Sequence, residues 1–479
     1  MTPPLLQRGF VHEQIRKLHD HIASIEAFGT ITSAGHELTP DTLTFLRHAL
    51  ADILAHEPAQ DVAGDYYSRS PLVNLMQSAL HDHLEHKRER ARAARDLSPD
   101  ARIAADAIEH DDEQMGDPFT KADIGGWVID IALSLVWRWL HGGVPFCDAP
   151  ARAYLPPKVR LVLFADWGTG REGAWNVRTQ AQHFAYEGSD PVHVIHLGDN
   201  YYSGTPREAR DNILGFWPVG PGSAGQIGSW ALNGNHDMYS GGHGLFETTL
   251  GDSRFHRQQA DGRPTSWFVL QTPDWNVLGL DTSWKHPLIE INGGAPYFEG
   301  SLGHLEGSQA DVLAACQRDA RRRLLVLSHH QLFSAYDHRS VFGGPTGTTP
   351  LEEKLAPLLA RRPVDVWFWG HEHDCLAYEP FENVEAARAI GHGAVPIAPR
   401  TDPPGTPIGD NEHVVKPNLD ADASDAMRVL RWEYRDYRIG RDGASQWAKH
   451  GLAVVDVEGR DLTVRYVDDE GNVWLTETL

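Results

Sequence analysis

Five short polar segments, most of them directly after apolar runs, constrain the fold of this chain more than any other feature. These segments are Asp166-Trp167-Gly168, Gly198-Asp199-Asn200-Tyr201-Tyr202, Gly234-Asn235-His236-Asp237, Val326-Leu327-Ser328-His329 and Gly370-His371-Glu372-His373. The apolar runs are typical of buried strands, and they cover Leu161–Ala165, Val192–Leu197, Leu324–Leu327 and Val364–Trp369. Because open α/β sheets bind ligands beyond the carboxyl ends of their strands, the pattern predicts one site built from these segments.

The residue types in the five segments are those that bind metal ions: carboxylates, imidazoles, an amide and a phenol. Asp199 can bridge two cations, because an ionised carboxylate has two oxygens and about four lone-pair sites. Asn235 offers a neutral amide oxygen. Two cations about 3.5–4 Å apart can clamp a phosphoryl oxygen and turn a shared water into a nucleophile. Taken singly each segment is compatible with an ordinary turn or loop, but their joint occurrence in this order favours a dinuclear hydrolytic centre.

The five segments resemble the signature of the calcineurin-like metallophosphoesterases, and within them most closely that of the purple acid phosphatases. The family pattern is Asp-x-Gly, Gly-Asp-x-x-Tyr, Gly-Asn-His-Asp/Glu, Val-x-x-His and Gly-His-x-His, and the chain carries every element between residues 158 and 398. Most other members of the superfamily carry Asp-x-His at the first segment. Here Gly168 replaces that histidine, and Tyr202 supplies a phenolate instead. The resemblance implies an α/β (α+β) fold: a four-layer sandwich of two mixed β-sheets flanked by helices.

The resemblance also implies ligands for two metal ions. Those of the first ion, typically ferric iron, would be Asp166, Tyr202, His373 and the bridging Asp199. Those of the second ion, a divalent Fe, Zn or Mn, would be Asp199, Asn235, His329 and His371. Hard oxygen ligands that include a phenolate suit Fe(III), whereas imidazole and amide ligands suit Zn or Fe(II).

Three further residues, in these segments or directly after them, are not expected to bind metal. In the family, the histidine at His236 lies beside the substrate and stabilises or protonates the leaving oxygen, and Asp237 holds it in orientation. His330 follows the expected ligand, and it is interpreted as a phosphate contact, a hydrogen-bonding support for the ligands, or an ordinary structural histidine. The spacing from Val326 favours His329 over His330 as the ligand.

The implied reaction is attack on a phosphate ester by a metal-bound hydroxide, in a phosphomonoesterase of purple acid phosphatase type. A phosphodiesterase or a nucleotide pyrophosphatase is the alternative, because it uses the same pair of ions and differs only in the wall of the pocket. An alternative from another class is a regulatory or scaffold protein that keeps the fold. That alternative predicts eroded ligands, and all seven expected ligands are present.

The charge and composition of the chain exclude some classes of binding partner. The formal net charge of −23 argues against a surface for nucleic acid or anionic membrane, so a small phosphorylated substrate is expected. Such a substrate would be attracted by the local charge of the metal ions. The three cysteines form no disulfide framework, and the first residues lack the apolar core of a secretory signal, which predicts a cytoplasmic location. The oligomeric state is not indicated.

Residues 1–155 are predicted to form an all-helical N-terminal domain, and residues 156–479 the catalytic domain. Ile15, Leu18, Ile22 and Ile25 mark one amphipathic helix face. Residues 127–140 are the most apolar segment, too short to span a bilayer and expected to dock the helical domain onto the catalytic one.

Two features are expected near the end of the catalytic domain. Residues 396–425, rich in proline and aspartate, are predicted to be a long loop close to the rim of the site. Leu452–Val457 and Leu462–Val467 are predicted to form a closing hairpin with Gly459 in its turn.

Overall fold

The computed structural model describes residues 8–25, 143–284, 303–333, 350–395 and 446–479, together with shorter pieces of helix or strand between these ranges. The chain divides into two compact units, each considered by itself. The smaller consists mainly of Pro3–Gly142 with Ile291–Pro296, and the larger mainly of Gly143–Glu290 with Tyr297–Leu479.

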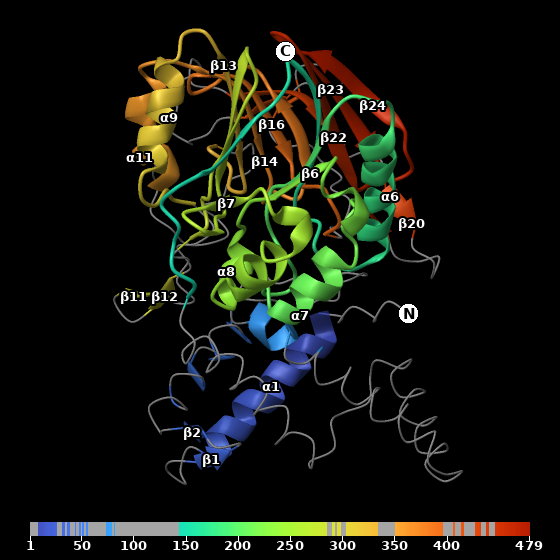
Figure 1. Cartoon of the computed structure of the whole chain (residues 1–479). Coiled ribbons are helices and arrows are strands. Elements are labelled where there is room, and N and C mark those ends of the chain that lie inside the picture. The colour runs from blue at the N-terminus through green and yellow to red at the C-terminus, as the bar shows by residue number, and fades with distance from the viewer. Residues whose placement is uncertain are drawn as a thin grey trace, which may run out of the picture. The chain divides into compact units, whose positions relative to one another are not determined.

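The larger unit contains two mixed β-sheets (Figure 1). The six-stranded sheet has the order β24-β23-β22-β4-β5-β6. Its strands are β4 (Lys158–Phe164), β5 (Val192–His196), β6 (Gly228–Ala231), β22 (Gly451–Glu458), β23 (Asp461–Asp468) and β24 (Val473–Thr478). Strands β4, β5 and β6 are parallel, so their carboxyl ends lie at one edge of the sheet.

The ten-stranded sheet has the order β17-β18-β19-β15-β16-β14-β13-β10-β9-β3. Its strands are β3 (Ala151–Tyr154), β9 (Phe268–Gln271), β10 (Trp275–Gly279), β13 (Arg323–Ser328), β14 (Val364–Trp369), β15 (Cys375–Tyr378), β16 (Val384–Ile390), β17 (Thr406–Pro407), β18 (His413–Val415) and β19 (Met427–Trp432). Strands β10, β13, β14 and β16 run parallel to one another in its centre.

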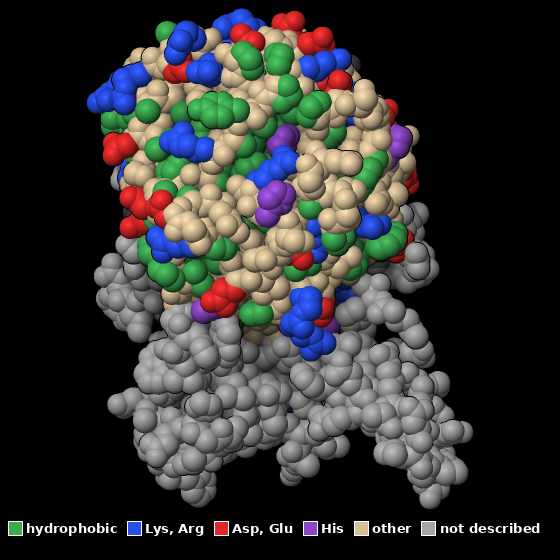
Figure 2. Space-filling model, viewed as in Figure 1, with side chains coloured by type: hydrophobic (Ala, Val, Ile, Leu, Met, Phe, Trp, Pro, Cys, Tyr) green, Lys and Arg blue, Asp and Glu red, His purple; other side chains and the backbone are tan. Residues whose placement is uncertain are grey.

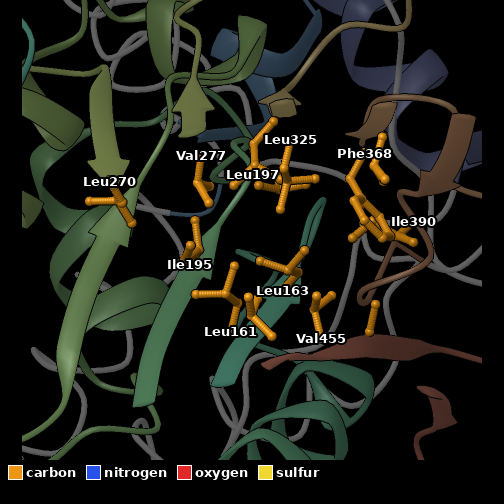
Figure 3. Close-up of a cluster of buried hydrophobic side chains, with 14 of the residues drawn as sticks. Leu161, Leu163, Ile195, Leu197, Leu270, Val277, Leu325, Phe368, Ile390 and Val455 are labelled. Atoms are coloured by element: carbon orange, nitrogen blue, oxygen red, sulfur yellow. The ribbon is translucent and has the colours of Figure 1, made fainter. Parts of the chain in front are cut away.

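Alternate side chains of the parallel strands pack into different apolar layers, which explains why these strands are continuous apolar runs. In β4, Leu161 and Leu163 face the core between the two sheets, where they meet Leu325 of β13 and Val455 of β22 (Figure 3). Phe164 packs on the other face with residues of helix α6 (Glu172–Tyr186). Both faces of each strand are therefore covered.

The ten-stranded sheet follows the same rule. Leu325 and Leu327 of β13 face the core between the sheets, whereas Leu324 and Val326 pack against the side of helices α9 (Gln309–Arg318) and α11 (Pro350–Leu359). Helix, sheet, sheet and helix thus form the α/β sandwich with two mixed sheets that the sequence predicts.

Short elements connect the main strands. They are α7 (Pro206–Glu208), η2 (Ala209–Leu214), η3 (Pro221–Ser223), α8 (Asn235–Tyr239), η4 (Gly244–Thr249), η5 (Ser253–Phe255), β7 (Gln259–Ala260), β8 (Arg263–Pro264), β11 (Glu290–Asn292), β12 (Ala295–Tyr297), β20 (Tyr437–Ile439) and β21 (Gln446–Ala448). Helix α7 continues directly into the π-helix η2.

In the smaller unit, helix α1 (Arg8–Ile25) buries Ile15, Leu18 and Ile22, as its amphipathic pattern predicts. A two-stranded antiparallel ladder follows, formed by β1 (Ile31–Ser33) and β2 (His36–Leu38). The all-helical prediction for this region is therefore not confirmed. The expected docking helix at residues 127–140 lies outside the described residues. Among the described residues, no helix is long and apolar enough to cross a membrane.

Three other expectations concern the larger unit. The closing hairpin is confirmed as β22 and β23, and Gly459 in its turn has a φ of 60°. Strand β3 lies before residue 156, so the ten-stranded sheet includes residues on the N-terminal side of the expected boundary. Strands β17 and β18 lie within the expected loop at 396–425, whose remaining residues are outside the described part of the chain.

Candidate metal centre

The residues expected to bind metal follow the carboxyl ends of parallel strands in both sheets. Asp166 follows β4, Asp199 follows β5, and Asn235 begins helix α8 after β6. In the other sheet, His329 directly follows β13, and the Gly-His-x-His segment follows β14. Since the two sheets face each other, these strand ends bring together residues that are far apart in the sequence.

Sharp backbone turns direct four of these side chains. Asp166, Asp199, His371 and His373 have φ values of 53°, 77°, 67° and 54°. Residues other than glycine rarely adopt this left-handed region, and each instance costs about 1–3 kcal/mol. Such strain persists where the surrounding structure enforces it, and it is concentrated at functional sites.

The first ligand group consists of Asp166, Asp199 and His373, whose ligand atoms lie within 4.8 Å of one another. A phenol completes this group, and it belongs to Tyr201. Its hydroxyl lies 3.0 Å from Asp166 Oδ1, 2.9 Å from Asp199 Oδ2 and 3.0 Å from His373 Nε2. Both carboxylates are fully buried.

The position of Tyr201 differs from the expectation, which assigned the phenol to Tyr202. Tyr202 contacts Glu208 through its backbone amide and His236 through its backbone carbonyl. Tyr201 and Tyr202 lie in a turn, where the local backbone sets the direction of each side chain, so the spacing of a motif does not decide which of the two tyrosines faces the ligands.

The second ligand group contains His329, His330 and His371, whose ligand atoms also lie within 4.8 Å of one another. His329 Nε2 lies 2.9 Å from Asn235 Oδ1 and 3.2 Å from His371 Nδ1. The amide of Asn235 is held by the hydroxyl of Tyr239, to which its Nδ2 donates at 2.7 Å. The carbonyl of Leu197 accepts from His329 Nδ1 at 3.1 Å, which leaves Nε2 to face the group.

Asp199 lies between the two groups. Its Oδ2 accepts from the hydroxyl of Tyr201 in the first group, and its Oδ1 lies 3.3 Å from His329 Nε2 in the second. One carboxylate therefore presents one oxygen to each group. This donor set of carboxylates, imidazoles, an amide and a phenol suits two metal ions that share Asp199.

The electrostatics of the buried site favour positive charge beside the carboxylates. Burial acts to raise the pKa of Asp199, but the imidazoles of His329, His236 and His371 hold that pKa well below its usual range. Burial acts to lower the pKa of His329, but Asp199 and the other nearby carboxyl groups raise it to about 9. Burial, together with the other imidazoles, keeps the pKa of His371 well below its usual range.

Asp237 does not hold His236, contrary to the expectation. Its Oδ2 accepts from the backbone amides of Gly234 at 2.9 Å and Asp199 at 3.1 Å, so it fixes the turn that carries the bridging residue. Burial and the nearby Asp199 raise the pKa of Asp237 to about 8. The expected contact fails because the carboxyl group satisfies two buried backbone amides instead.

The orientation of His236 comes from a backbone carbonyl. His236 Nδ1 donates to the carbonyl of Tyr202 at 2.6 Å, and its Nε2 lies 3.8 Å from Asp199 Oδ2. The ring of Tyr201 packs against the imidazole, with 4.3 Å between the ring centroids. Burial lowers the pKa of His236, whereas the charge of Asp199 acts in the opposite direction.

His330 is fully buried, and its Nδ1 lies 3.0 Å from the hydroxyl oxygen of Thr282 and 3.3 Å from that of Ser283. Its ring lies 4.6 Å from that of His371, centroid to centroid. His330 thus contacts the ligand His371 through its ring, while its Nδ1 hydrogen-bonds to residues outside the ligand set. Sequence reasoning missed Thr282 and Ser283, which follow strand β10 on the same side as the candidate ligands follow theirs.

The fold and the two ligand groups define an α/β metallophosphoesterase domain. Residues 159–375 match the family described as calcineurin-like phosphoesterase, so this part of the chain carries a calcineurin-like phosphoesterase domain. The matched residues begin within β4 and include every candidate ligand. Among curated proteins, none matches the chain.

Several solved structures are distantly similar. The Plasmodium inner-membrane-complex anchor GAP50 is 14% identical, with 67% of this chain and 88% of that chain covered and a TM-score of 0.40. The purple acid phosphatase PPD1 from yellow lupin is 15% identical, with 67% and 53% covered and a TM-score of 0.42. The structure of PhoD is 10% identical, with 70% of each chain covered and a TM-score of 0.38. Likeness at this level carries no argument about activity.

Proposed function

We propose that this protein is a dinuclear phosphoester hydrolase, most specifically a phosphomonoesterase of purple acid phosphatase type. The position of Asp199 supports this proposal most strongly, because its two oxygens face two separate ligand groups. The hydroxyl of Tyr201 in the first group adds the phenol that distinguishes this type. In this assignment Tyr201 takes the role first expected of Tyr202.

Two bound cations would supply charge that stabilises the transferring phosphoryl group and lower the pKa of a water. The carboxylates of Asp166 and Asp199 would bind these cations, because they are buried among imidazoles and do not face solvent. His236 presents Nε2 to the site, and a proton carried there would pass to the leaving oxygen. The phenol and carboxylates of the first group suit Fe(III), and the second group suits Fe(II), Zn or Mn.

The substrate in this proposal is a small phosphorylated molecule. On the face shown in Figure 2, Lys and Arg side chains are interspersed with Asp and Glu side chains, and the net charge of the chain is −23. The attraction for phosphate therefore has to come from the metal centre. A cytoplasmic location is also part of the proposal, and the three cysteines, all buried and unbridged, suit a reducing compartment.

A paired substrate test decides between the activities. The purified protein, loaded in turn with iron, zinc and manganese, is assayed with p-nitrophenyl phosphate and with bis-p-nitrophenyl phosphate. A higher kcat/KM for the monoester, abolished by a chelator, is the expected result. Preference for the diester would support the phosphodiesterase alternative. A metal-loaded protein inert toward both esters would contradict the proposal and favour a scaffold role.

A further inference from the structure

One loop touches both the first ligand group and the proposed acid. Residues 201–205 connect the bridging Asp199 to helix α7, and they carry the hydroxyl of Tyr201 and the carbonyl of Tyr202. The Tyr201 hydroxyl contacts the ligands, and the Tyr202 carbonyl accepts from His236 Nδ1. The position of this loop therefore affects two parts of the site together.

A single buried carboxylate binds the loop. Glu208, which is 5% exposed, accepts from the backbone amide of Tyr202 at 2.6 Å through Oε1. Its Oε2 accepts from the amides of Ser203 at 3.3 Å and Thr205 at 2.9 Å, and from the hydroxyl of Thr205 at 3.0 Å. The carboxylate thus satisfies three backbone amides and one hydroxyl of the same short loop, as buried polar groups require.

The loop is also fixed by other neighbours. Asn212, one helical turn beyond Glu208, donates from Nδ2 to the carbonyl of Tyr201 at 2.9 Å. On the opposite side, the hydroxyl of Ser240 donates to the carbonyl of Gly204 at 2.8 Å. Gly204 has a φ of 62°, and a Cβ there would lie 2.5 Å from the Cα of Asp237, so the loop packs directly on the backbone of helix α8.

We propose that Glu208 is a positioning residue for the reaction: it holds the Tyr202 carbonyl against His236 Nδ1, so that Nε2 faces the leaving group. This inference rests on the proposed function and deepens it, because it explains how the His236 ring is held at Nδ1 by a backbone carbonyl rather than by Asp237. A ring that donates from Nδ1 has its other nitrogen directed to the site. A loop that is free to move would lose this constraint.

The variant Glu208→Gln tests the assignment with little change in shape. A carboxamide has one acceptor oxygen, and its NH₂ group would face backbone amides that are themselves donors. The matched control is Asp468→Asn. Asp468 is also buried and accepts from backbone amides, of Glu470 at 3.0 Å and Asn472 at 2.8 Å, but in the turn after β23.

The readout is the dependence of rate on the leaving group, because departure of a poor leaving group needs a proton and departure of a good one does not. In Glu208→Gln, kcat for phenyl phosphate should fall by roughly 10-fold or more, and kcat for p-nitrophenyl phosphate by less than about 3-fold. In a His236→Ala background the same change should leave this ratio unaltered, since the effect acts through His236. Asp468→Asn should leave the ratio at its wild-type value.

A second readout does not depend on activity. In protein labelled with ¹⁵N-histidine, the signals lost in His236→Ala identify His236. At a pH where the ring is neutral, which is its state after giving up the Nε2 proton, they should show one Nδ1-protonated tautomer in the wild type. Glu208→Gln should give a mixture of tautomers, while Asp468→Asn should not. An equal fall for both substrates, or an unchanged tautomer, would overturn the assignment.

Failure of the proposed function is distinguishable from failure of this inference. If the wild type is inert toward both esters, the proposed function fails and the tautomer comparison still decides the role of Glu208. If Glu208→Gln does not fold, Asn212→Ala replaces it, since it removes one contact to the same loop. A smaller shift of the substrate ratio in the same direction is then expected, and an unchanged ratio would overturn the assignment.

Discussion

At the scale of single residues, Asp199 makes most of the contacts that define the site. One oxygen faces Tyr201, the other faces His329 and accepts from the backbone amide of His236, and its own amide donates to Asp237. Every polar group of the residue is therefore used. The chemical nature of the site could be predicted from sequence because these residue types have few other reasons to occur together after buried strands.

Two adjacent tyrosines provide the first prediction. In iron-loaded protein, Tyr201→Phe should abolish the visible absorption that phenolate-to-ferric charge transfer produces, because the hydroxyl of Tyr201 lies among the ligands. Tyr202→Phe is the matched control and should keep that absorption. Visible spectra with iron analysis of both variants check this. Bleaching by Tyr202→Phe alone would restore Tyr202 as the ligand, and colour and iron retained in both variants would exclude the purple acid phosphatase type.

At the scale of elements, the periodicity of apolar residues predicts the strands well, but it does not predict which groups the polar side chains of the turns contact. The apolar runs that become β4, β5, β13 and β14 are buried on both faces, and such runs are evident in a sequence. The contacts of Asp237 and Glu208 could not be predicted in this way. They depend on which backbone amides a turn leaves unpaired, and this is decided by three-dimensional packing rather than by residue spacing.

Strand β5 carries a histidine that should make the fold sensitive to acid. His193 is buried and accepts from the indole N–H of Trp230 at 2.9 Å, and burial, with a contribution from Arg257, lowers its pKa to about 4. The unfolded chain binds this proton near pH 6.5, so the stabilisation is complete above that pH and is lost as the pH falls toward 4.

His193→Gln measures this contribution directly. Between pH 7 and pH 4, the free energy of unfolding should fall by about 3 kcal/mol less in the variant than in the wild type. Urea unfolding at both pH values provides the measurement. Equal losses in the two proteins would mean that His193 is protonated as easily in the folded state as in the unfolded one.

At the scale of the whole larger unit, the two sheets are joined by an ion pair between a buried arginine and a half-buried glutamate, as well as by the apolar core. Arg388 of β16 forms two hydrogen bonds of 2.7 Å with Glu477 of β24, which also accepts from the hydroxyl of Tyr466. Breaking such a pair leaves one buried charge without a partner, which is strongly destabilising.

Glu477→Gln should therefore lower the free energy of unfolding by about 3 kcal/mol or more. The matched control is Glu187→Gln, which removes a surface partner of Arg160 at 2.8 Å and should cost less than about 1 kcal/mol. Urea unfolding of both variants at neutral pH distinguishes the two pairs. Similar small losses would show that the apolar core alone joins the sheets.

The most direct test of the metal centre is anomalous diffraction from crystals of the metal-loaded protein. The account predicts two anomalous peaks about 3.5–4 Å apart, with the carboxylate of Asp199 between them. A single peak, or two peaks with Asp199 bound to neither or to only one of them, would contradict it.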